Sequence, residues 1–559
     1  MKRCLCIGFL SLLGVCAAAQ EEEILRAAQY LSGASTAEEV PSEWVERLEA
    51  LHGRRIRVND AHPRADGLLS EYQLASLADY RATAGDVLSW EELALVDGFG
   101  REAVTALRPL LSLASERLPG STDTVLTRAS LMVRTTLSQV GAKARASGEH
   151  WRVGGAWRGS EGSFYGEYSR RGHRLLLGDY HLRYGQGLAT WTGFSIESLS
   201  TVDAFIRRAA GVSPSGSYNA SLCRRGGAYE YAGQHGVLAA FGALDGSFGT
   251  HADYRWRHGQ IGLTATSVLK AGPAVIPDLI GNLCVSLDGR YNRRGRDWVF
   301  EGAWQKRSLA GKAAFRCGLG EAWKLALQAR AIPSRFSGKK NGEYALSAGS
   351  AWKSGRWVPL AGKAGFGSSI PSADVSLTLD AALLPIPADP ASRIQVRAYA
   401  TWKWQMSPAW ALTLRLTERY RNYEAPRTDF RLDLKRAVGP WQSTVRAESV
   451  YCTAWGLLTY LESGYKADLL HAWLRLTGFW IDNWADRIYC YERDAAGTFS
   501  VPAYSGRGLS LSAVCGYKLR LGRTPRRRIT LKANLRAAWM VRENRHPAPT
   551  LNFQLQCER

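Results

Sequence analysis

The chain after residue 120 alternates between apolar and polar residues. Every even position from Ile394 to Trp404 is apolar, whereas the odd positions are polar or Tyr. The same period of two recurs in residues 412–417, 430–435 and 529–537. This period places the two sets on opposite faces of a β-sheet. A soluble β-structure would alternate in the same way, but runs of nine to eleven residues, some of which end in Trp, favour a transmembrane barrel.

The length of this region predicts the size of the barrel. Residues 121–559 provide roughly 24 strands at about 18 residues per strand and connection. We therefore expect an even number of antiparallel strands between 22 and 26. Glycine-containing turn sequences fall between candidate strands, for example Arg170-Arg171-Gly172 and Arg293-Arg294-Gly295. Eighteen of the 20 Trp follow residue 121, as expected for aromatic anchors at a membrane interface.

Residues 20–117 show the pattern of short helices instead. Ser89-Trp90-Glu91-Glu92 is a capping box that starts one helix. A tight turn at Asp97-Gly98-Phe99-Gly100 separates it from a second helix over residues 101–107. Gly98-x-Gly100-x-x-Ala103 also matches a dinucleotide fingerprint, but no strand precedes it. The pattern favours a helix-hairpin-helix in which amides at the second helix face a DNA phosphate. The candidate contacts are Gly98, Phe99, Gly100 and Arg101.

The first 19 residues predict export. Lys2 and Arg3 precede an apolar run from Cys4 to Cys16, and Ala17-Ala18-Ala19 forms a small-residue cleavage site. The mature chain would begin at Gln20. An alternative lipoprotein signal at Cys16 has the bulky Val15 before it. The seven later cysteines are scattered, which predicts neither a disulfide framework nor a zinc site.

Charge divides the mature chain into two unlike parts. The net charge of +22 combines 18 acids and 10 bases in residues 20–117 with 32 acids and 60 bases in residues 118–559. The polar faces of the predicted strands carry many of these bases, which should line the barrel lumen: Arg397, Lys403, Arg415, Arg431, Lys435, Lys532 and Arg536. Such a lumen attracts polyanions. The partner could be DNA, lipopolysaccharide phosphate at the rim, or the acidic N-terminal part docked at or in the periplasmic mouth.

Residues 56–114 resemble a known DNA-binding domain. The resemblance rests on Arg57 to Ala61, Ser70 to Arg81, and Val96 to Gly100 up to Pro109, and points to the tandem helix-hairpin-helix domain of ComEA-like competence proteins. It implies double-stranded DNA binding in the cell envelope. Gly67-Leu68-Leu69-Ser70 departs from the pattern by lacking a second glycine, and an acidic segment without Lys opposes phosphate binding. The alternative is a module for packing or protein docking.

A second resemblance covers Leu175 to Leu188, which includes Gly178-Asp179-Tyr180 and Tyr184-Gly185-Gln186-Gly187. It is similar to a stretch in Bacteroidetes-type helix-hairpin-helix domain proteins of the envelope. The resemblance implies an outer-membrane location and no established activity. Together with the patterns above, the predicted organisation is a signal peptide at 1–19, an acidic helical lead-in at 20–55, a tandem helix-hairpin-helix domain at 56–117 and a barrel at 121–559.

Catalytic patterns are absent from the sequence. It contains no H-E-x-x-H, G-x-S-x-G or Walker motif, and no two His stand at metal-ligand spacing. Glu167 and Asp179 are each expected to form a salt bridge with a basic residue of the Arg-rich barrel. We predict no enzyme, no metal and no cofactor.

The expected fold is a small all-α helix-hairpin-helix domain plus a large all-β transmembrane barrel. We expect the chain to lie in outer-membrane lipid, with its helical domain in the periplasm. The predicted function is a conduit or docking site for a polyanion, with DNA uptake as its most specific form. The competing prediction is a structural or assembly component whose helical domain binds another envelope protein or plugs the barrel. The sequence does not predict an oligomeric state.

Overall fold

The computed structural model describes most of the chain. The described residues are 20–52, 55–60, 67–114, 128–193, 199–233, 235–269, 281–320, 322–337, 342–354, 357–359, 366–368, 372–386, 389–467, 469–495, 500–522, 529–543 and 545–559. The predicted signal peptide lies outside these residues.

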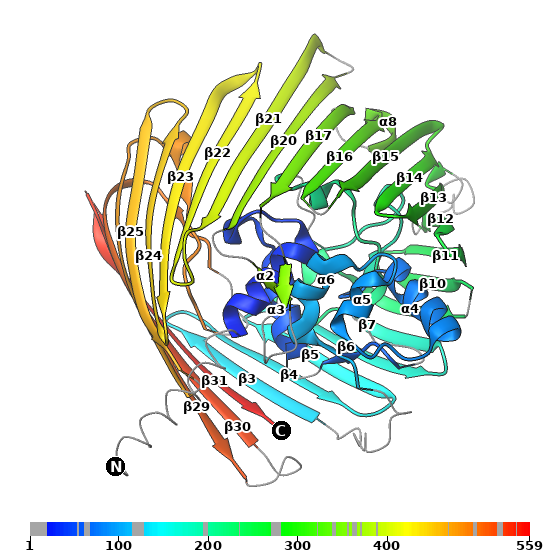
Figure 1. Cartoon of the computed structure of the whole chain (residues 1–559), viewed down its shortest axis with the longest axis horizontal. Coiled ribbons are helices and arrows are strands. Elements are labelled where there is room, and N and C mark those ends of the chain that lie inside the picture. Colours follow the sequence, from blue (N-terminus) through cyan, green and yellow to red (C-terminus); the bar gives the residue numbers. More distant parts are fainter. Residues whose placement is uncertain are drawn as a thin grey trace.

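In the part of the chain that the structure describes, 24 antiparallel strands close into one barrel (Figure 1). The first twelve are β3 (Arg128–Thr136), β4 (Val140–Ser147), β5 (Trp151–Arg158), β6 (Glu161–Arg170), β7 (His173–Arg183), β9 (Arg224–Ala232), β10 (Val237–Ala243), β11 (Ser247–Trp256), β12 (Gly259–Val268), β13 (Cys284–Arg293), β14 (Arg296–Gln305) and β15 (Ser308–Leu319). The other twelve are β16 (Trp323–Ile332), β17 (Glu343–Lys353), β20 (Ser372–Ile386), β21 (Asp389–Gln405), β22 (Trp410–Arg421), β23 (Glu424–Val438), β24 (Trp441–Tyr451), β25 (Trp455–Lys466), β26 (Leu470–Ile481), β29 (Gly506–Leu521), β30 (Ile529–Arg542) and β31 (Arg545–Glu558). Pairing of β3 with β31 closes the ring, and the predicted strand number is confirmed.

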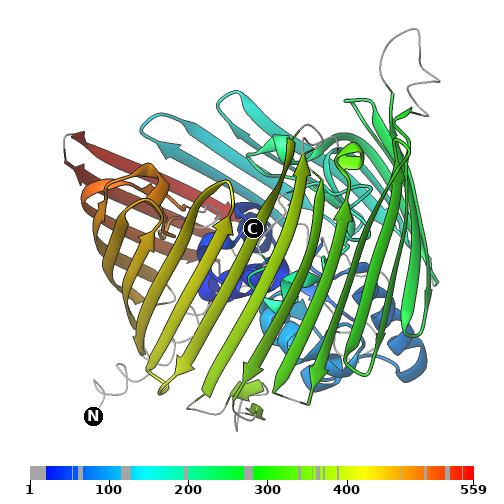
Figure 2. The same cartoon turned by 90° about the horizontal axis from the view of Figure 1, so that it is seen from above.

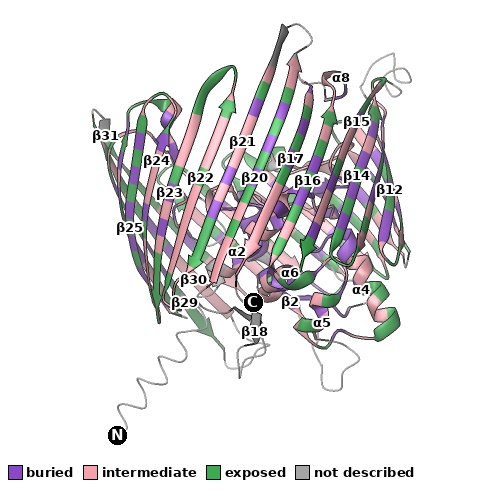
Figure 3. Ribbon diagram, turned by 45° about the horizontal axis from the view of Figure 1, so that its top comes forward, coloured by how far each residue is buried: buried purple, intermediate pink, exposed green. Residues whose placement is uncertain are grey.

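The outer face of the wall is apolar. Along β25, Leu457 and Leu461 are exposed, whereas the alternating Leu458 and Tyr460 are buried (Figure 3). Exposed aromatic residues stand near both ends of the strands: Trp151, Trp256, Trp298, Trp323 and Trp441 at one end, and Trp157, Trp304, Tyr451, Trp480 and Trp539 at the other. An apolar band between two aromatic girdles is the surface of a membrane-spanning barrel.

The two ends of the barrel differ. We call the end where β3 begins and β31 ends the terminal rim, because Ser130 pairs there with Glu558. Two long connections leave the opposite rim. Residues 184–223 contain η3 (Val202–Phe205), β8 (Gly211–Pro214) and η4 (Ala220–Leu222). Residues 482–505 contain η5 (Trp484–Asp486), β27 (Ile488–Tyr489) and β28 (Ala503–Tyr504). Shorter elements occupy other connections: α8 (Ser334–Ser337), β18 (Trp357–Pro359) and β19 (Phe366–Ser368).

Residues 20–114 form the N-terminal helical segment. Its helices are α2 (Gln20–Ser32), η1 (Ala37–Glu39), α3 (Ser42–His52), α4 (Glu71–Ala84), α5 (Trp90–Leu95), α6 (Gly100–Leu107) and η2 (Arg108–Leu110). The short strands β1 (Ile56–Arg57) and β2 (Leu111–Ser112) pair in parallel. The segment has its own apolar core, in which Leu48, Leu68, Leu93 and Leu107 are fully inaccessible. Among the described residues, no helix combines the length and apolar character needed to cross a membrane.

The helical segment lies within the barrel, and α4 and α5 reach the terminal rim (Figures 2 and 3). This is the position expected of an acidic N-terminal part that docks at or in a mouth of the barrel, while its periplasmic location stays a prediction. The α5–α6 hairpin itself has the expected local form. Ser89 and Glu92 make the predicted capping box, and Gly98 and Gly100 adopt φ values of 82° and 72°. The tandem helix-hairpin-helix domain stays a prediction.

Candidate functional site in the charged lumen

An acidic residue of the helical segment is buried between two arginines of the wall. Glu38 of η1 contacts Arg431 of β23 at 2.8 Å and Arg446 of β24 at 2.6 Å. The amide of Tyr491, on the inward 482–505 connection, donates to the same carboxylate at 3.1 Å. Burial alone would raise the pKa of Glu38, but the two guanidinium groups hold it well below its ordinary value. One carboxylate thus joins the segment, the wall and a connection from the opposite rim.

Two further acids of the segment extend this junction. Glu39 forms an ion pair with Arg415 of β22 and accepts a hydrogen bond from Ser200 at 2.7 Å. Burial opposes ionisation, yet Arg415 lowers the pKa of Glu39. Glu46 of α3 contacts Lys143 of β4 at 2.7 Å. The acidic segment is therefore held from several sides of the basic wall.

The candidate DNA-binding hairpin is attached to the terminal rim. Glu102 forms ion pairs with Lys324 and Lys353, and these lysines lower its pKa to about 2 although burial acts in the other direction. Asp97 contacts the ring of His258 at 3.0 Å. The two residues flank the glycine turn, so the ion pairs fix the hairpin against the wall.

Two of the four candidate DNA contacts are used inside the protein. The carbonyl of Gly98 accepts a hydrogen bond from Gln73 at 2.8 Å, and Phe99 is buried. Gly100 and Arg101 are exposed. Of the four candidate contacts, the two exposed ones thus lie at the start of α6.

The predicted lumen bases have different surroundings. Arg415 and Arg431 bind the helical segment, as described above. Arg536 is buried and forms an ion pair with Glu492 of the inward 482–505 connection, while Lys532 contacts Glu558 at 2.8 Å. Lys403 and Lys435 are exposed on the inward faces of β21 and β23, toward the terminal rim. Arg397 lines a cavity.

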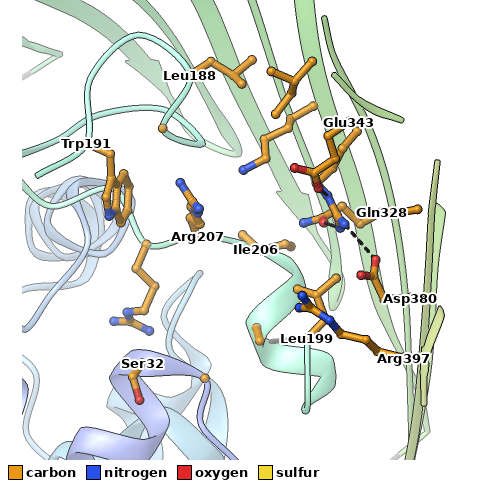
Figure 4. A pocket seen from close by; sticks show the side chains of 18 of the residues that line it. Ser32, Leu188, Trp191, Leu199, Ile206, Arg207, Gln328, Glu343, Asp380 and Arg397 are labelled. Carbon is orange, nitrogen blue, oxygen red and sulfur yellow. Dashed lines mark hydrogen bonds and ion pairs between the residues drawn. The ribbon is translucent and has the colours of Figure 1, made fainter. Parts of the chain in front are cut away.

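This cavity lies between the helical segment, the 184–223 connection and the wall (Figure 4). Its volume is about 620 Å³, and seven of its lining residues are basic: Arg183, Arg207, Arg208, Lys312, Arg330, Arg397 and Arg421. Three are acidic: Asp203, Glu343 and Asp380. Both Glu343 and Asp380 contact Arg330 at 2.8 Å, and Asp203 contacts Arg316 at 2.8 Å. The lining acids are already paired, so the cavity keeps an excess of positive charge.

The glycine motif at the end of β7 builds one side of this cavity. Gly185 and Gly187 have φ values of 57° and 80°, which turn the chain inward. The amides of Gln186, Leu188 and Ala189 then donate to the carboxylate of Glu301 on β14 at 2.6, 3.0 and 3.2 Å. A motif that stood out in the sequence therefore has a structural role.

The predicted roles of two acids in the wall are confirmed. Asp179 contacts Arg225 at 2.9 Å. Glu167 pairs with Arg152 and contacts Arg174 at 3.3 Å. None of the seven described cysteines forms a disulfide bond.

A second acidic cluster was not predicted. Glu71, the first residue of α4, meets His251 and Asp253 of β11, with one potential ligand atom from each within 4.8 Å of the others. Burial, followed by the charge of Asp253, raises the pKa of Glu71 to about 8. The one sequence signal for this cluster is His251-x-Asp253, a spacing that places both side chains on one face of a strand.

Comparisons with known proteins find similarity only at the level of solved structures. No protein-family profile and no curated protein sequence matches the chain. The outer membrane protein opdK from Pseudomonas aeruginosa aligns with a TM-score of 0.30 and 10% identity over 78% of this chain and 99% of that chain. Pseudomonas aeruginosa OccK9 (OpdG) aligns with a TM-score of 0.29 and 11% identity over 78% of this chain and 97% of that chain.

Proposed function

We propose that this protein is an outer-membrane β-barrel that binds anionic solutes in its basic cavity and uses its N-terminal helical segment as a plug. The observation that carries the proposal is the position of the cavity. The segment supplies Ser32 and Trp44 on one side, and the wall supplies Arg330 and Arg397 on the other. An anion bound there touches both the plug and the wall.

The outer membrane is supported by two independent features. The N-terminal sequence has the form of an export signal, and the wall presents an apolar band between aromatic girdles. The interior has the opposite character, since inward residues such as Glu301, Arg431 and Arg446 are charged and ion-paired or hydrogen-bonded.

The charge and the size of the cavity define the solute class. Its volume falls in the range of small-molecule sites, which is about 300–1,000 Å³. An excess of Arg and Lys favours carboxylate, sulfate or phosphate groups, and the fixed fork of Arg binds such groups through two hydrogen bonds. A small organic anion or oxyanion is therefore the solute that we propose.

Conductance in planar lipid bilayers tests this proposal. We expect the full-length protein to show anion preference in a KCl gradient, and Arg397→Ser to shift the reversal potential toward cations. Arg436→Ser removes the same charge from the outer face, where Arg436 lies over the ring of Trp410, and should leave selectivity unchanged. Equal selectivity of the native protein and Arg397→Ser would contradict the proposal.

DNA docking at the terminal rim is the second candidate function. Glu102 follows Arg101 in the acidic segment, and its negative charge is offset by Lys324 and Lys353. The exposed start of α6 therefore lies beside two lysines of the wall that pair with Glu102. Binding of duplex DNA to the full chain should fall as salt rises, and Arg101→Ala should weaken it. Binding that is independent of salt and of Arg101 would exclude this role.

A further inference from the structure

Three side chains from two distant parts of the chain meet where the helical segment touches the wall. Glu71 begins α4, and His251 and Asp253 lie two residues apart on β11. One carboxylate oxygen from each acid and one ring nitrogen lie within 4.8 Å of one another. Two carboxylates and an imidazole are a common ligand set for divalent metals.

Three polar atoms of this cluster are buried and lack hydrogen-bond partners within the described parts of the chain. Both carboxylate oxygens of Glu71 and the Nε2 atom of His251 have no such partner. Glu71 is 5% exposed and His251 is 2% exposed. Nε2 lies 3.7 Å from a carboxylate oxygen of Asp253, which is too long for a hydrogen bond. Buried polar atoms without partners are costly unless a ligand satisfies them.

Neighbouring residues already hold the side chains of His251 and Asp253 in place. Nδ1 of His251 contacts the hydroxyl of Thr264 at 2.8 Å. With its proton on Nδ1, the ring presents the lone pair of Nε2 to the cluster. Asp253 accepts from the amide of Val237 and from Arg255, both at 2.7 Å, and each oxygen keeps a second lone pair. The ring of Tyr184 stacks on His251 with a centroid distance of 3.9 Å.

The 184–223 connection forms another side of the cluster through Gly211. A side chain at Gly211 would place its Cβ 2.9 Å from an oxygen of Glu71 and 2.9 Å from an oxygen of Glu230. Glycine therefore lets the backbone approach two carboxylates at once. Two bases lie beside this group: Arg255 contacts Asp253 at 2.7 Å, and Arg174 contacts Glu230 at 3.8 Å. The carboxyl groups of Glu71, Asp253, Glu230 and the buried Asp288 outnumber these bases.

We propose that Glu71, His251 and Asp253 bind one divalent transition-metal ion, with Zn²⁺ as the preferred ion and Mn²⁺ as its competitor. A mixed nitrogen and oxygen ligand set favours these ions over Mg²⁺ and Ca²⁺, which take oxygen ligands. Zinc requires ligand distances of about 2.0–2.2 Å, so the three side chains must close by roughly 1 Å. The bound ion fastens the helical segment to the wall.

Metal content of the full-length protein tests the site directly. The protein is folded in detergent, stripped with a chelator, and then equilibrated with Zn²⁺ or Mn²⁺ before elemental analysis. We expect about one ion per native chain and much less than one for Glu71→Gln. The Gln variant keeps the shape of the side chain, and His251→Ala provides a second test on the wall. Retention of the mobility difference between heated and unheated protein in gels checks that each barrel is folded.

Glu46→Gln is the matched control. It makes the same change in the same helical segment and also breaks a contact with the wall, but Glu46 lies on Lys143 rather than in the cluster. It should retain one ion per chain. Thr264→Val tests positioning, because loss of the Nδ1 partner should weaken Zn²⁺ binding by about 10–100-fold.

Two results would overturn the proposal. One is a native protein that retains no more Zn²⁺ or Mn²⁺ than Glu71→Gln. The other is binding of Ca²⁺ alone, at a level that His251→Ala does not change. Replacement by Co²⁺ adds a spectroscopic test, since the visible bands of a nitrogen-ligated ion should be present in the native protein and altered in His251→Ala. Metal content can be measured whether or not the barrel conducts anions.

Discussion

Glu38 and Arg431 are 393 positions apart in the chain, yet the carboxylate of one contacts the guanidinium of the other at 2.8 Å inside the barrel. Both side chains are at least nine-tenths buried. A buried ion pair is stable only when its geometry is good. Removing one partner leaves an unpaired buried charge, which destabilises the folded state. This pair therefore reports whether the helical segment is docked.

Glu38→Gln should weaken the docking of the helical segment without unfolding the barrel. Breaking a buried ion pair costs about 3–5 kcal/mol, because Arg431 and Arg446 then lose their shared counter-charge. Hydrogen exchange of α2 and α3 should accelerate, while the exchange of β23 changes less. Glu91→Gln, at an exposed position of α5, is the control and should leave both regions unchanged. Equal exchange in Glu38→Gln and the native protein would contradict the prediction.

Acid should also loosen the segment. The pKa of Glu102 is lowered to about 2 from an ordinary value near 4.5, and the pKa of Glu38 is lowered as well. A lowered pKa means that the stabilisation is complete above pH 4.5 and is lost as the pH falls toward 2. For Glu102 the loss is on the order of 2–3 kcal/mol.

Exchange of α6 measured between pH 7 and pH 3 checks this dependence. It should rise, after correction for intrinsic rates, only below pH 4.5. Glu102→Gln should make α6 exchange faster at neutral pH and remove part of the acid response. Loosening that instead begins as the pH rises above neutrality would show that the carboxylates do not control docking.

Two glycines with the same φ angle distinguish backbone strain from steric contact as causes of destabilisation. Gly185 and Gly439 both have a φ of 57°. A Cβ at Gly185 would lie 2.8 Å from the carboxyl carbon of Glu301, whereas nothing lies within 4 Å at Gly439. Both Ala substitutions carry the left-handed penalty of about 1–2 kcal/mol.

Gly185→Ala should cost more than Gly439→Ala, because it also displaces Glu301 from the three amides that it binds. Faster proteolysis within residues 184–223 should accompany the larger loss of thermal stability. Equal stability and equal proteolysis of the two variants would mean that Glu301 does not organise the turn.

The lipid-facing band can be tested by one charge. Leu461 is 56% exposed near the middle of β25. Arg at a mid-membrane position costs about 2–4 kcal/mol, falling to about 0–1 near the interface. Leu461→Arg should therefore lower the unfolding free energy in lipid vesicles, whereas Leu137→Arg, in the connection between β3 and β4, should change it little. The same loss at both positions would contradict the placement of the band.

The sequence predicted those features that depend on local order. Alternation from Ile394 to Trp404 lies within β21, and the run at 529–537 lies within β30. The predicted capping box of Ser89 and Glu92 is present, and Ser70 and Gln73 form a second one of the related S-x-x-Q type. Each of these signals spans only a few residues, so one sequence suffices to read it.

Contacts across the lumen could not be predicted in the same way. The charge difference between residues 20–117 and 118–559 indicates that the two parts attract, but it does not indicate that Glu38 meets Arg446. The Glu71 and His251 cluster joins positions 180 residues apart, and Glu71 meets its proposed ligand partners on β11 rather than on its own helix. Such pairs depend on the depth at which the segment sits, which only the closed barrel defines.

The seam between β3 and β31 has a consequence for assembly. The helical segment precedes β3 in the chain, and Val133 must pair with Leu555 before the ring is complete. Once the barrel is closed, the helical segment cannot enter between strands. It is therefore either enclosed while the strands close around it or inserted later through one end of the barrel. The first and last strands thus set the time at which the interior becomes a sealed compartment, and the order of biogenesis decides what it contains.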